Sequence, residues 1–212
     1  MEKIFAIGDI HGCLSHLERL ISVLDIRSNK DRLVFIGDYI DRGPDSKGVV
    51  DFILNLKDTF RKVTCLLGNH EQMLLNYLHG RDVELFLSNG GASTLASYGF
   101  QTFRGNSSSH VSDCHLQFYH SLLPFCEIDD YVFVHAGLRP GIPLAEQIPD
   151  DLLQIRHEFI KSRYDFGRKV VFGHTPFPAP LFEFNKIGID TGAAYGGHLT
   201  CLELPSMQIY QV

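Results

Sequence analysis

The sequence predicts a single α/β domain built around a parallel sheet, and three observations predict it. Short apolar runs alternate with helix-period segments through the N-terminal third of the chain, a spacing typical of βαβ units. The chain has 212 residues, of which 44% are hydrophobic and 21% charged, as expected of one globular domain. Its apolar runs stay well below the roughly 18 residues of a membrane span, so we expect no membrane partner.

Three strand–helix pairs are expected in the N-terminal part. Continuous apolar runs predict strands at Lys3–Gly8, Arg32–Gly37 and Val63–Gly68. Apolar residues at helical spacing predict helices at Leu14–Leu24, Ser46–Leu56 and Glu71–Leu78. Ser46 is the expected N-cap of the second helix, because its hydroxyl can accept a hydrogen bond from the first turn.

The rest of the chain is less regular. Asn89–Ser109 is rich in Gly and Ser, and we expect an irregular segment over one end of the sheet. Strands are predicted at Tyr131–Val134 and Lys169–Phe172, with a helix near Asp150–Lys161 between them. Leu181–Tyr210 has the pattern of three short strands separated by glycine turns, for which antiparallel pairing is expected.

Charge and cysteine content exclude several classes of protein. The net charge is −6 without a run of lysines or arginines, which argues against a nucleic-acid partner. The five cysteines form no Cys-x-x-Cys pair, so neither a disulfide framework nor a thiolate zinc site is indicated. Reduced cysteines, and an N-terminus that begins a strand with no cleavage site, favour a cytoplasmic protein.

Polar residues suited to metal binding follow almost every predicted strand. They are Asp9 and His11, Asp38 and Asp41-Arg42, Asn69-His70, His135, and His174. The carboxyl ends of parallel strands converge on one crevice, so these side chains should meet. Any one of them alone could be a turn or packing residue, but recurrence at five strand ends favours a shared site. Carboxylate, imidazole and amide oxygen suit divalent cations, and a carboxylate can bridge two of them.

On these residues the chain resembles the PPP-type metallophosphoesterases, the family of serine/threonine protein phosphatases. The motifs that carry the resemblance are Gly8-Asp9-Ile10-His11-Gly12, Gly37-Asp38-Tyr39-Ile40-Asp41-Arg42-Gly43, Gly68-Asn69-His70-Glu71, His135-Ala136-Gly137 and Gly173-His174-Thr175. Asn89-Gly90-Gly91, Ile155-Arg156 and Asp190-Thr191-Gly192 are similar to the compact bacterial and phage branch. The resemblance implies a calcineurin-like metallophosphoesterase β-sandwich of mixed sheets flanked by helices, with residues 1–212 as one catalytic domain.

The resemblance also implies a role for each motif residue. Asp9, His11 and Asp38 would hold a first metal ion. Asp38 would bridge to a second ion, which Asn69, His135 and His174 complete. Arg42 and Arg156 would bind the phosphoryl oxygens. His70, oriented by Asp41, would face the leaving group. Manganese is expected to support activity in vitro, with iron or zinc as alternatives.

The implied activity is hydrolysis of phosphoserine and phosphothreonine in a phosphoprotein or phosphopeptide, with phosphotyrosine left open. A hydroxide that bridges the two metal ions would attack phosphorus directly. The two cations outweigh Asp9, Asp38 and the hydroxide by about one positive charge, which would attract an anionic substrate to an acidic protein. The C-terminal part lacks the Ser-Ala-Pro-Asn-Tyr pattern of the eukaryotic enzymes, so their inhibitors and regulatory partners are not implied.

Two rivals share the fold. A symmetrical dinucleoside tetraphosphatase would have the same metal ligands, but its second motif resembles Ala-Arg-Gly-Pro, whereas this chain has Asp41-Arg42-Gly43-Pro44. The second rival is a catalytically inactive binding scaffold, which the retention of every ligand disfavours.

Two short motifs point elsewhere. Cys13 and Arg19 fit the Cys-x5-Arg loop of cysteine-dependent tyrosine phosphatases, but the intervening residues have a helical pattern without glycine. Ile187–Ala193 resembles an aspartic-protease signature and is expected to be a turn that closes the pocket floor. Asp190 could then lie near the phosphate site.

Overall fold

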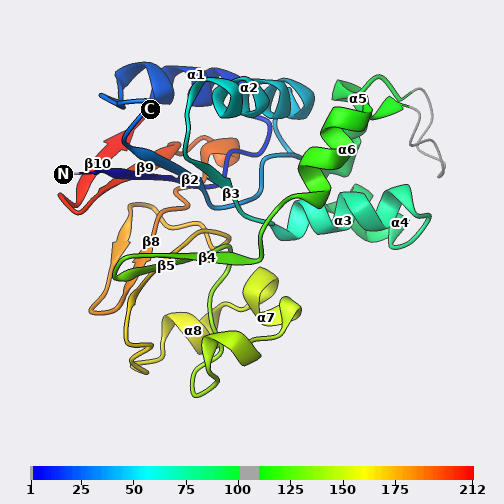
Figure 1. Ribbon diagram of the computed structural model, residues 1–212. Coiled ribbons are helices and arrows are strands. Elements are labelled where there is room, and N and C mark those ends of the chain that lie inside the picture. Colours follow the sequence, from blue (N-terminus) through cyan, green and yellow to red (C-terminus); the bar gives the residue numbers. More distant parts are fainter. Residues whose placement is uncertain (1, 101–109) are drawn as a thin grey trace.

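Two mixed β-sheets stack face to face, and helices cover the outside of each (Figure 1). The computed structural model describes residues 2–100 and 110–212, which form both five-stranded sheets. This architecture confirms the predicted fold class. It also corrects the expectation of one parallel sheet, because there are two sheets and each combines parallel with antiparallel strand pairs.

The first sheet has the strand order β10-β9-β1-β2-β3. The strands are β1 (Ile4–Ile7), β2 (Arg32–Phe35), β3 (Val63–Cys65), β9 (Thr200–Leu204) and β10 (Gln208–Gln211). β1, β2 and β3 run parallel, and β9 pairs antiparallel with β1. The sheet therefore joins both ends of the described chain.

The second sheet has the strand order β4-β5-β6-β8-β7. The strands are β4 (Phe125–Ile128), β5 (Tyr131–Val134), β6 (Lys169–Phe172), β7 (Leu181–Phe182) and β8 (Lys186–Gly188). β5, β6 and β8 run parallel, while β4 and β7 are antiparallel edges. The central strands of both sheets thus send their carboxyl ends into loops that can carry a site.

The continuous apolar runs of the sequence arise because both faces of each sheet are covered. Alternate residues of β1 face opposite layers: Ile4 and Ala6 pack between the sheets, whereas Phe5 and Ile7 pack beneath helices. Phe5 is fully buried, and burial of a side chain of this kind contributes about 1.5–3 kcal/mol to stability.

The helices form three groups (Figure 1). α1 (Leu14–Val23) and α2 (Ser46–Thr59) cover the first sheet, and α7 (Pro149–Gln154) and α8 (His157–Ile160) lie beneath the second. A lateral group comprises α3 (Asn69–Leu78), α4 (Val83–Phe86), a π-helical turn (Leu87–Gly91), α5 (Ala92–Ser97) and α6 (Asp113–His120). Short 3-10 turns occupy Leu144–Glu146 and Ala193–Tyr195. None of the helices in the described part has the length and apolarity needed to cross a bilayer.

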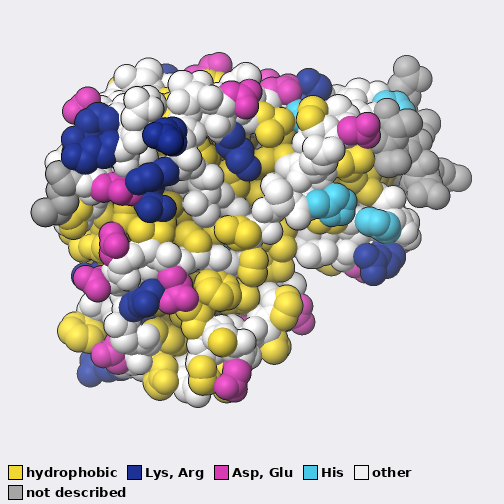
Figure 2. Space-filling model, viewed as in Figure 1, with side chains coloured by type: hydrophobic (Ala, Val, Ile, Leu, Met, Phe, Trp, Pro, Cys, Tyr) yellow, Lys and Arg dark blue, Asp and Glu magenta, His cyan; other side chains and the backbone are white. Residues whose placement is uncertain are grey.

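Side chains of opposite charge are interspersed on the face shown in Figure 2. Lys3 pairs with Glu203 at 3.2 Å, and Lys62 pairs with Glu2 at 2.9 Å. Lys62 and Glu2 are partly exposed, and ion pairs at a protein surface contribute little to stability. The attraction of an anion must therefore come from a local site.

The second helix is capped differently from the prediction. Asp45 is the N-cap, and its side chain accepts a hydrogen bond from the Gly48 amide at 2.8 Å. The Ser46 hydroxyl instead accepts a hydrogen bond from the Asp41 amide at 3.0 Å and bonds the Thr94 hydroxyl at 2.9 Å. The hydroxyl is fully buried and serves the loop before the helix rather than the helix itself.

Two segments differ from the prediction in their secondary structure. Residues 92–97 form α5 after a kink at Gly90, rather than an irregular segment, and residues 101–109 lie outside the described residues. Gly90 makes the turn possible, since it adopts φ 99° and a Cβ there would lie 2.9 Å from the Arg42 amide nitrogen. The helix expected at Asp150–Lys161 is broken, because Ile155 is extended (ψ 140°) and Arg156 has φ −130° and ψ −94°.

The C-terminal run contains four strands rather than three, divided between the two sheets. β7 and β8 pair antiparallel in the second sheet, and β9 and β10 pair antiparallel in the first. Antiparallel pairing is thus confirmed, although β8 also pairs parallel with β6. The edge strand β4 and the helices α4 and α6 were not predicted, because each is short and has weak periodicity.

Asp31 fixes the connection between α1 and β2 and generates a stability prediction. Its fully buried carboxylate accepts hydrogen bonds from the Arg27 guanidinium (2.6 and 2.9 Å), the Arg27 amide (2.9 Å) and the Lys3 amide (3.0 Å). Burial raises the pKa of the carboxyl, but the hydrogen bonds from these donors lower it by a larger amount. The pKa of Asp31 therefore lies below its ordinary value.

Asp31→Asn is expected to lower the free energy of unfolding by about 1–3 kcal/mol at pH 7, because a charge-assisted network loses its acceptor. A depressed folded-state pKa stabilises the fold above the unfolded pKa of about 3.9 and loses that effect as pH falls. Urea unfolding at pH 7 and pH 3 measures this, with exposed Asp58→Asn as the control. A difference from wild type that does not shrink at pH 3 would contradict the network.

Candidate metal centre

The loops after β1, β2, β3, β5 and β6 meet at one end of the sandwich. Nine of the ten residues predicted for the site follow these strands, and the tenth, Arg156, lies between α7 and α8. Because β1 to β3 belong to the first sheet and β5 and β6 to the second, the crevice lies between two sheets, not at the rim of one as predicted. The sheets converge there closely enough that the ring of His135 donates a hydrogen bond to the Ile36 carbonyl at 3.1 Å.

Five site residues adopt left-handed backbone conformations. The φ angles are 47° for His11, 50° for Asp38, 70° for Asp41, 66° for Arg42 and 62° for His174. Each such residue costs of order 1 kcal/mol, which surrounding structure must offset. Close packing adds a further constraint, since a Cβ on Gly68 would lie 2.2 Å from a carboxylate oxygen of Asp38. Sharp turns of this kind are common at functional sites.

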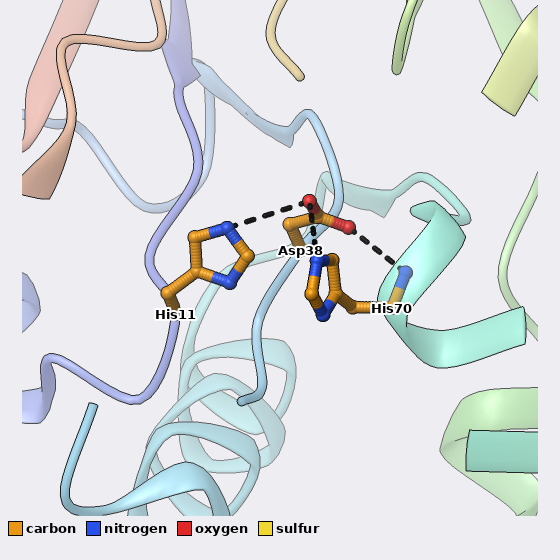
Figure 3. Close-up of side chains that lie close together, drawn as sticks. All are labelled: His11, Asp38 and His70. Carbon is orange, nitrogen blue, oxygen red and sulfur yellow. Dashed lines mark hydrogen bonds and ion pairs between the residues drawn. The ribbon is translucent and has the colours of Figure 1, made fainter. Parts of the chain in front are cut away.

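Asp38 lies at the centre of the cluster (Figure 3). Its Oδ2 is 3.5 Å from His11 Nε2 and 3.9 Å from His70 Nε2. Its Oδ1 is 3.4 Å from His135 Nε2 and accepts a hydrogen bond from the His70 amide at 3.2 Å. One carboxylate therefore faces imidazoles on two sides, the arrangement that a bridging ligand needs.

A second group gathers around Asn69, the first residue of α3. Its Oδ1 is 2.9 Å from His135 Nε2 and 3.0 Å from His174 Nδ1. Ligand atoms of Asp38, His135 and His174 all lie within 4.8 Å of one another, as do those of Asp38, His11 and His70. The structure thus brings together two donor sets that share Asp38.

His11 and His135 present lone pairs rather than protons to these sets. His11 Nδ1 donates to the Ile40 carbonyl at 2.8 Å, so its Nε2 lacks a proton in the neutral ring, and His135 follows the same pattern. Burial lowers the pKa of His11 and of His174 to about 3 and also lowers that of His135. Several acceptors then face one another, which is favourable only around a cation.

Asp9 fits a cation in a different way. Its Oδ2 accepts a hydrogen bond from the His174 amide at 2.9 Å, whereas Oδ1 is buried without a hydrogen-bond partner in the described part of the protein. Burial and the nearby Asp190 and Asp38 carboxylates raise its pKa well above the ordinary value. A divalent ion would supply the missing partner. The donor set that contains His11 and Asp38, however, includes His70 in the place where the sequence predicted Asp9.

His70 and Asp41 form a buried dyad beside Asp38. His70 Nδ1 donates to Asp41 Oδ2 at 2.6 Å, and both side chains are almost fully buried. The Thr94 hydroxyl donates to Asp41 Oδ1 at 2.5 Å, which fixes the carboxylate from the other side. The dyad orients His70 Nε2 toward the centre, where it can bind a metal ion or deliver a proton.

Both predicted arginines border the site. Arg42 contacts the His11 ring nitrogen, and its guanidinium carbon lies 5.2 Å from the centre of the Tyr195 ring. The sequence predicted Arg156 within a helix, but it lies in the break between α7 and α8. Its guanidinium donates a hydrogen bond to the Thr175 hydroxyl at 3.3 Å. The break places Arg156 with Asn69 and His174 around one cleft.

The two other motifs do not build sites of their own. α1 begins at Leu14, and burial raises the pKa of the Cys13 thiol, opposite to what a nucleophilic cysteine needs. The protease-like segment forms a turn in which Asp190 accepts a hydrogen bond from the Gly192 amide at 2.9 Å. Burial raises the pKa of Asp190 to about 6. The negative charge of Asp190 in turn helps to raise the pKa of Asp9.

Glu71 is a residue to which the sequence analysis gave no role. Its fully buried carboxylate accepts four backbone hydrogen bonds: Oε2 from Asp38 (3.0 Å) and Gly68 (3.1 Å), and Oε1 from Tyr39 (2.8 Å) and Ile40 (3.3 Å). It therefore ties the loop after β2 to the loop after β3. Its position in the Gly68–Glu71 motif marked it, but three of its four partners are more than thirty residues away in sequence.

Comparison with known proteins places this geometry in context. The sequence pattern of the calcineurin-like phosphoesterases matches residues 2–200. The chain is 29% identical to an asymmetrical bis(5'-nucleosyl)-tetraphosphatase PrpE of Anoxybacillus flavithermus and 27% identical to that of Bacillus thuringiensis, over 97% of this chain and 92% of each relative.

Solved structures give the same fold. A candidate diadenosine tetraphosphatase is 25% identical, with a TM-score of 0.77 over 100% of this chain and 93% of the other. A cold-active protein-tyrosine phosphatase of Shewanella gives 0.69 at 19% identity, covering 100% and 80%. A serine/threonine phosphatase of Saccharomyces cerevisiae gives 0.68 at 16% identity, covering 99% and 79%. The last two likenesses concern the fold alone.

Glu71→Gln tests the support of the metal centre. The amide leaves one acceptor oxygen where two were, so about 1–3 kcal/mol of stability should be lost. Mn²⁺ affinity, measured by titration calorimetry, should fall about 10- to 100-fold, as is usual when a group behind the ligands is changed. Glu18→Gln, at an exposed position of α1, is the matched control. An unchanged affinity for Mn²⁺ would show that Glu71 does not set the ligand geometry.

Proposed function

The chain belongs to the calcineurin-like phosphoesterase family, as its motifs predicted, and we propose that it hydrolyses phosphate monoesters of serine and threonine in proteins. Members of this family are metal-dependent hydrolases, and the two donor sets around Asp38 suit divalent cations. The proposal concerns the substrate, the reacting groups and their roles.

One observation carries the proposal, the buried dyad of His70 and Asp41. Serine and threonine alkoxides are poor leaving groups and need a proton as the ester bond breaks. Asp41 accepts the Nδ1 proton of His70 at 2.6 Å and thereby orients the ring so that Nε2, when it carries a proton, can donate it to the leaving oxygen. Cleavage of a phosphoanhydride has less need of such a donor, because phosphate leaves readily as an anion.

The remaining groups bind and orient the phosphate. Two divalent cations held by Asp9, His11, Asp38, Asn69, His135 and His174 would lower the pKa of a bound water and supply a nucleophile near neutral pH. Arg42 and Arg156, at the borders of the cluster, can bind phosphoryl oxygens through bidentate hydrogen bonds. Arg42 is oriented by the Tyr195 ring, and Arg156 by Thr175.

A second function is favoured by the comparisons. The relatives from Anoxybacillus and Bacillus are named asymmetrical bis(5'-nucleosyl)-tetraphosphatases, and the structure with the TM-score of 0.77 is a candidate diadenosine tetraphosphatase. A dinucleoside tetraphosphate is therefore the alternative substrate. The names point to asymmetrical cleavage, whereas the sequence had suggested the symmetrical reaction as the alternative.

A substrate comparison separates the two functions. With Mn²⁺ bound, the enzyme is expected to hydrolyse a phosphoserine peptide with a kcat/KM at least about tenfold above that for diadenosine tetraphosphate, because the dyad assists ester cleavage. Phosphate release and nucleotide chromatography measure the two reactions. The reverse preference would favour the tetraphosphatase, and no turnover of any substrate by metal-loaded protein would favour an inactive scaffold.

His70→Asn tests the role of the dyad. Loss of a general acid should lower kcat for a phosphoserine peptide about 10²- to 10⁴-fold. Turnover of p-nitrophenyl phosphate should fall far less, since its leaving group hardly needs a proton. His79→Asn, at the exposed end of the same helix, serves as the control.

Metal content decides between the two roles that the geometry of His70 permits. If His70 is the proton donor, His70→Asn keeps two bound Mn²⁺ ions. If it is instead a ligand beside His11 and Asp38, the variant loses one ion and both substrates slow equally.

A further inference from the structure

A cleft beside the metal centre has a lining that bears on the substrate. Its volume is roughly 430 Å³, and Asn69, Arg156 and His174 form the end next to the metal centre. α3 and α4 lie on one side and α7 on the other (Figure 1), and the surface is indented between them (Figure 2). Whatever extends from a phosphate bound at the centre in this direction must enter the cleft.

The lining is mainly uncharged. Three apolar side chains (Met73, Leu85, Leu153) alternate with four amides (Gln72, Asn76, Asn89, Gln154). Apolar surface with a few hydrogen-bonding groups is typical of sites that hold an organic ligand. Side-chain amides can both donate to and accept from a peptide backbone, so this lining suits an extended polypeptide segment.

The charges of the cleft oppose an anionic occupant. Asp82 and Asp150 line it, and Arg156 is the sole cation among its described lining residues. Asp82 is held in place, since its Oδ2 accepts a hydrogen bond from Asn76 Nδ2 at 2.8 Å. Arg81 contacts the other end of the Asn76 amide at 3.3 Å but does not line the cleft. Beyond the phosphate-binding end, the cleft is therefore negative.

We propose that this cleft holds the polypeptide next to the phosphorylated residue, and that Asp82 and Asp150 select against substrates with further negative charge there. The proposal rests on the proposed function and deepens it. A dinucleoside tetraphosphate would bring further phosphates toward two carboxylates, and no cation other than Arg156 is among the described lining residues to receive them. Repulsion of a competing ligand is an established route to specificity.

The experiment compares substrates that differ only in charge. Phosphoserine peptides with alanines or with glutamates after the phosphoserine are assayed with wild type and Asp150→Lys, each normalised to its own rate on p-nitrophenyl phosphate. Wild type should prefer the alanine peptide about tenfold in kcat/KM, and Asp150→Lys should reduce this preference about three- to tenfold. The preference of wild type for the alanine peptide, and the difference in preference between wild type and Asp150→Lys, should both be smaller in about 0.5 M salt, because exposed charges are screened.

The matched control is Asp58→Lys, the same charge change at an exposed position of α2. It should keep the wild-type preference. Asp82→Asn combined with Asp150→Asn provides a milder change if lysine at position 150 disturbs α7, and it should also reduce the preference. A wild-type preference near one, or an equal loss in Asp58→Lys, would overturn the role of the cleft.

A further arm keeps this test separate from that of the proposed function. If no phosphopeptide is hydrolysed, the proposed function fails, but the cleft can still be tested with diadenosine tetraphosphate. Asp150→Lys should raise kcat/KM for that substrate about three- to tenfold relative to p-nitrophenyl phosphate. An unchanged ratio would refute the charge selection whatever the substrate of the enzyme.

Discussion

The whole site depends on holding one buried carboxylate, that of Asp38, where the two sheets converge. Its backbone is left-handed, and its side chain is surrounded by the imidazoles of His11, His70 and His135. Burying such a charge is costly unless it is paired. Glu71 fixes the loop through four backbone amides, and the shared donor sets make a pair of cations the natural partner. The left-handed turns cost free energy, and they persist because the hydrogen bonds to Glu71 hold the loop in place.

The same arrangement reconciles an acidic protein with an anionic substrate. The net charge of −6 would repel a phosphate, and the exposed ion pairs do not produce a positive surface. Divalent cations at the crevice, with Arg42 and Arg156 at its borders, would reverse the sign locally. The adjacent cleft carries negative charge because Asp82 and Asp150 line it. In the proposed mode of binding, attraction would be confined to the phosphate itself, and the rest of the substrate would meet a different environment.

Errors in the expected elements have physical causes. Ser46 carries the side chain of an N-cap, but Asp45 caps the helix because the serine hydroxyl is used by Asp41 and Thr94. The Gly-rich segment near Asn89 is kinked at Gly90, whose positive φ allows close approach to Arg42, and is helical from Ala92 to Ser97. The helix expected at Asp150–Lys161 breaks and thereby places Arg156 by the site. In each case a long-range contact overrides a local preference.

The sequence by itself determined the family, the fold class and the residues that gather at the strand ends, because each lies in a motif directly after an apolar run. Only the tertiary structure decided which of those residues are neighbours. The placement of His70 beside His11, the support from Glu71, the division of the strands between two sheets and the charged cleft all depend on contacts between segments distant in sequence. Local periodicity carries no information about such contacts, since they arise when two sheets pack face to face.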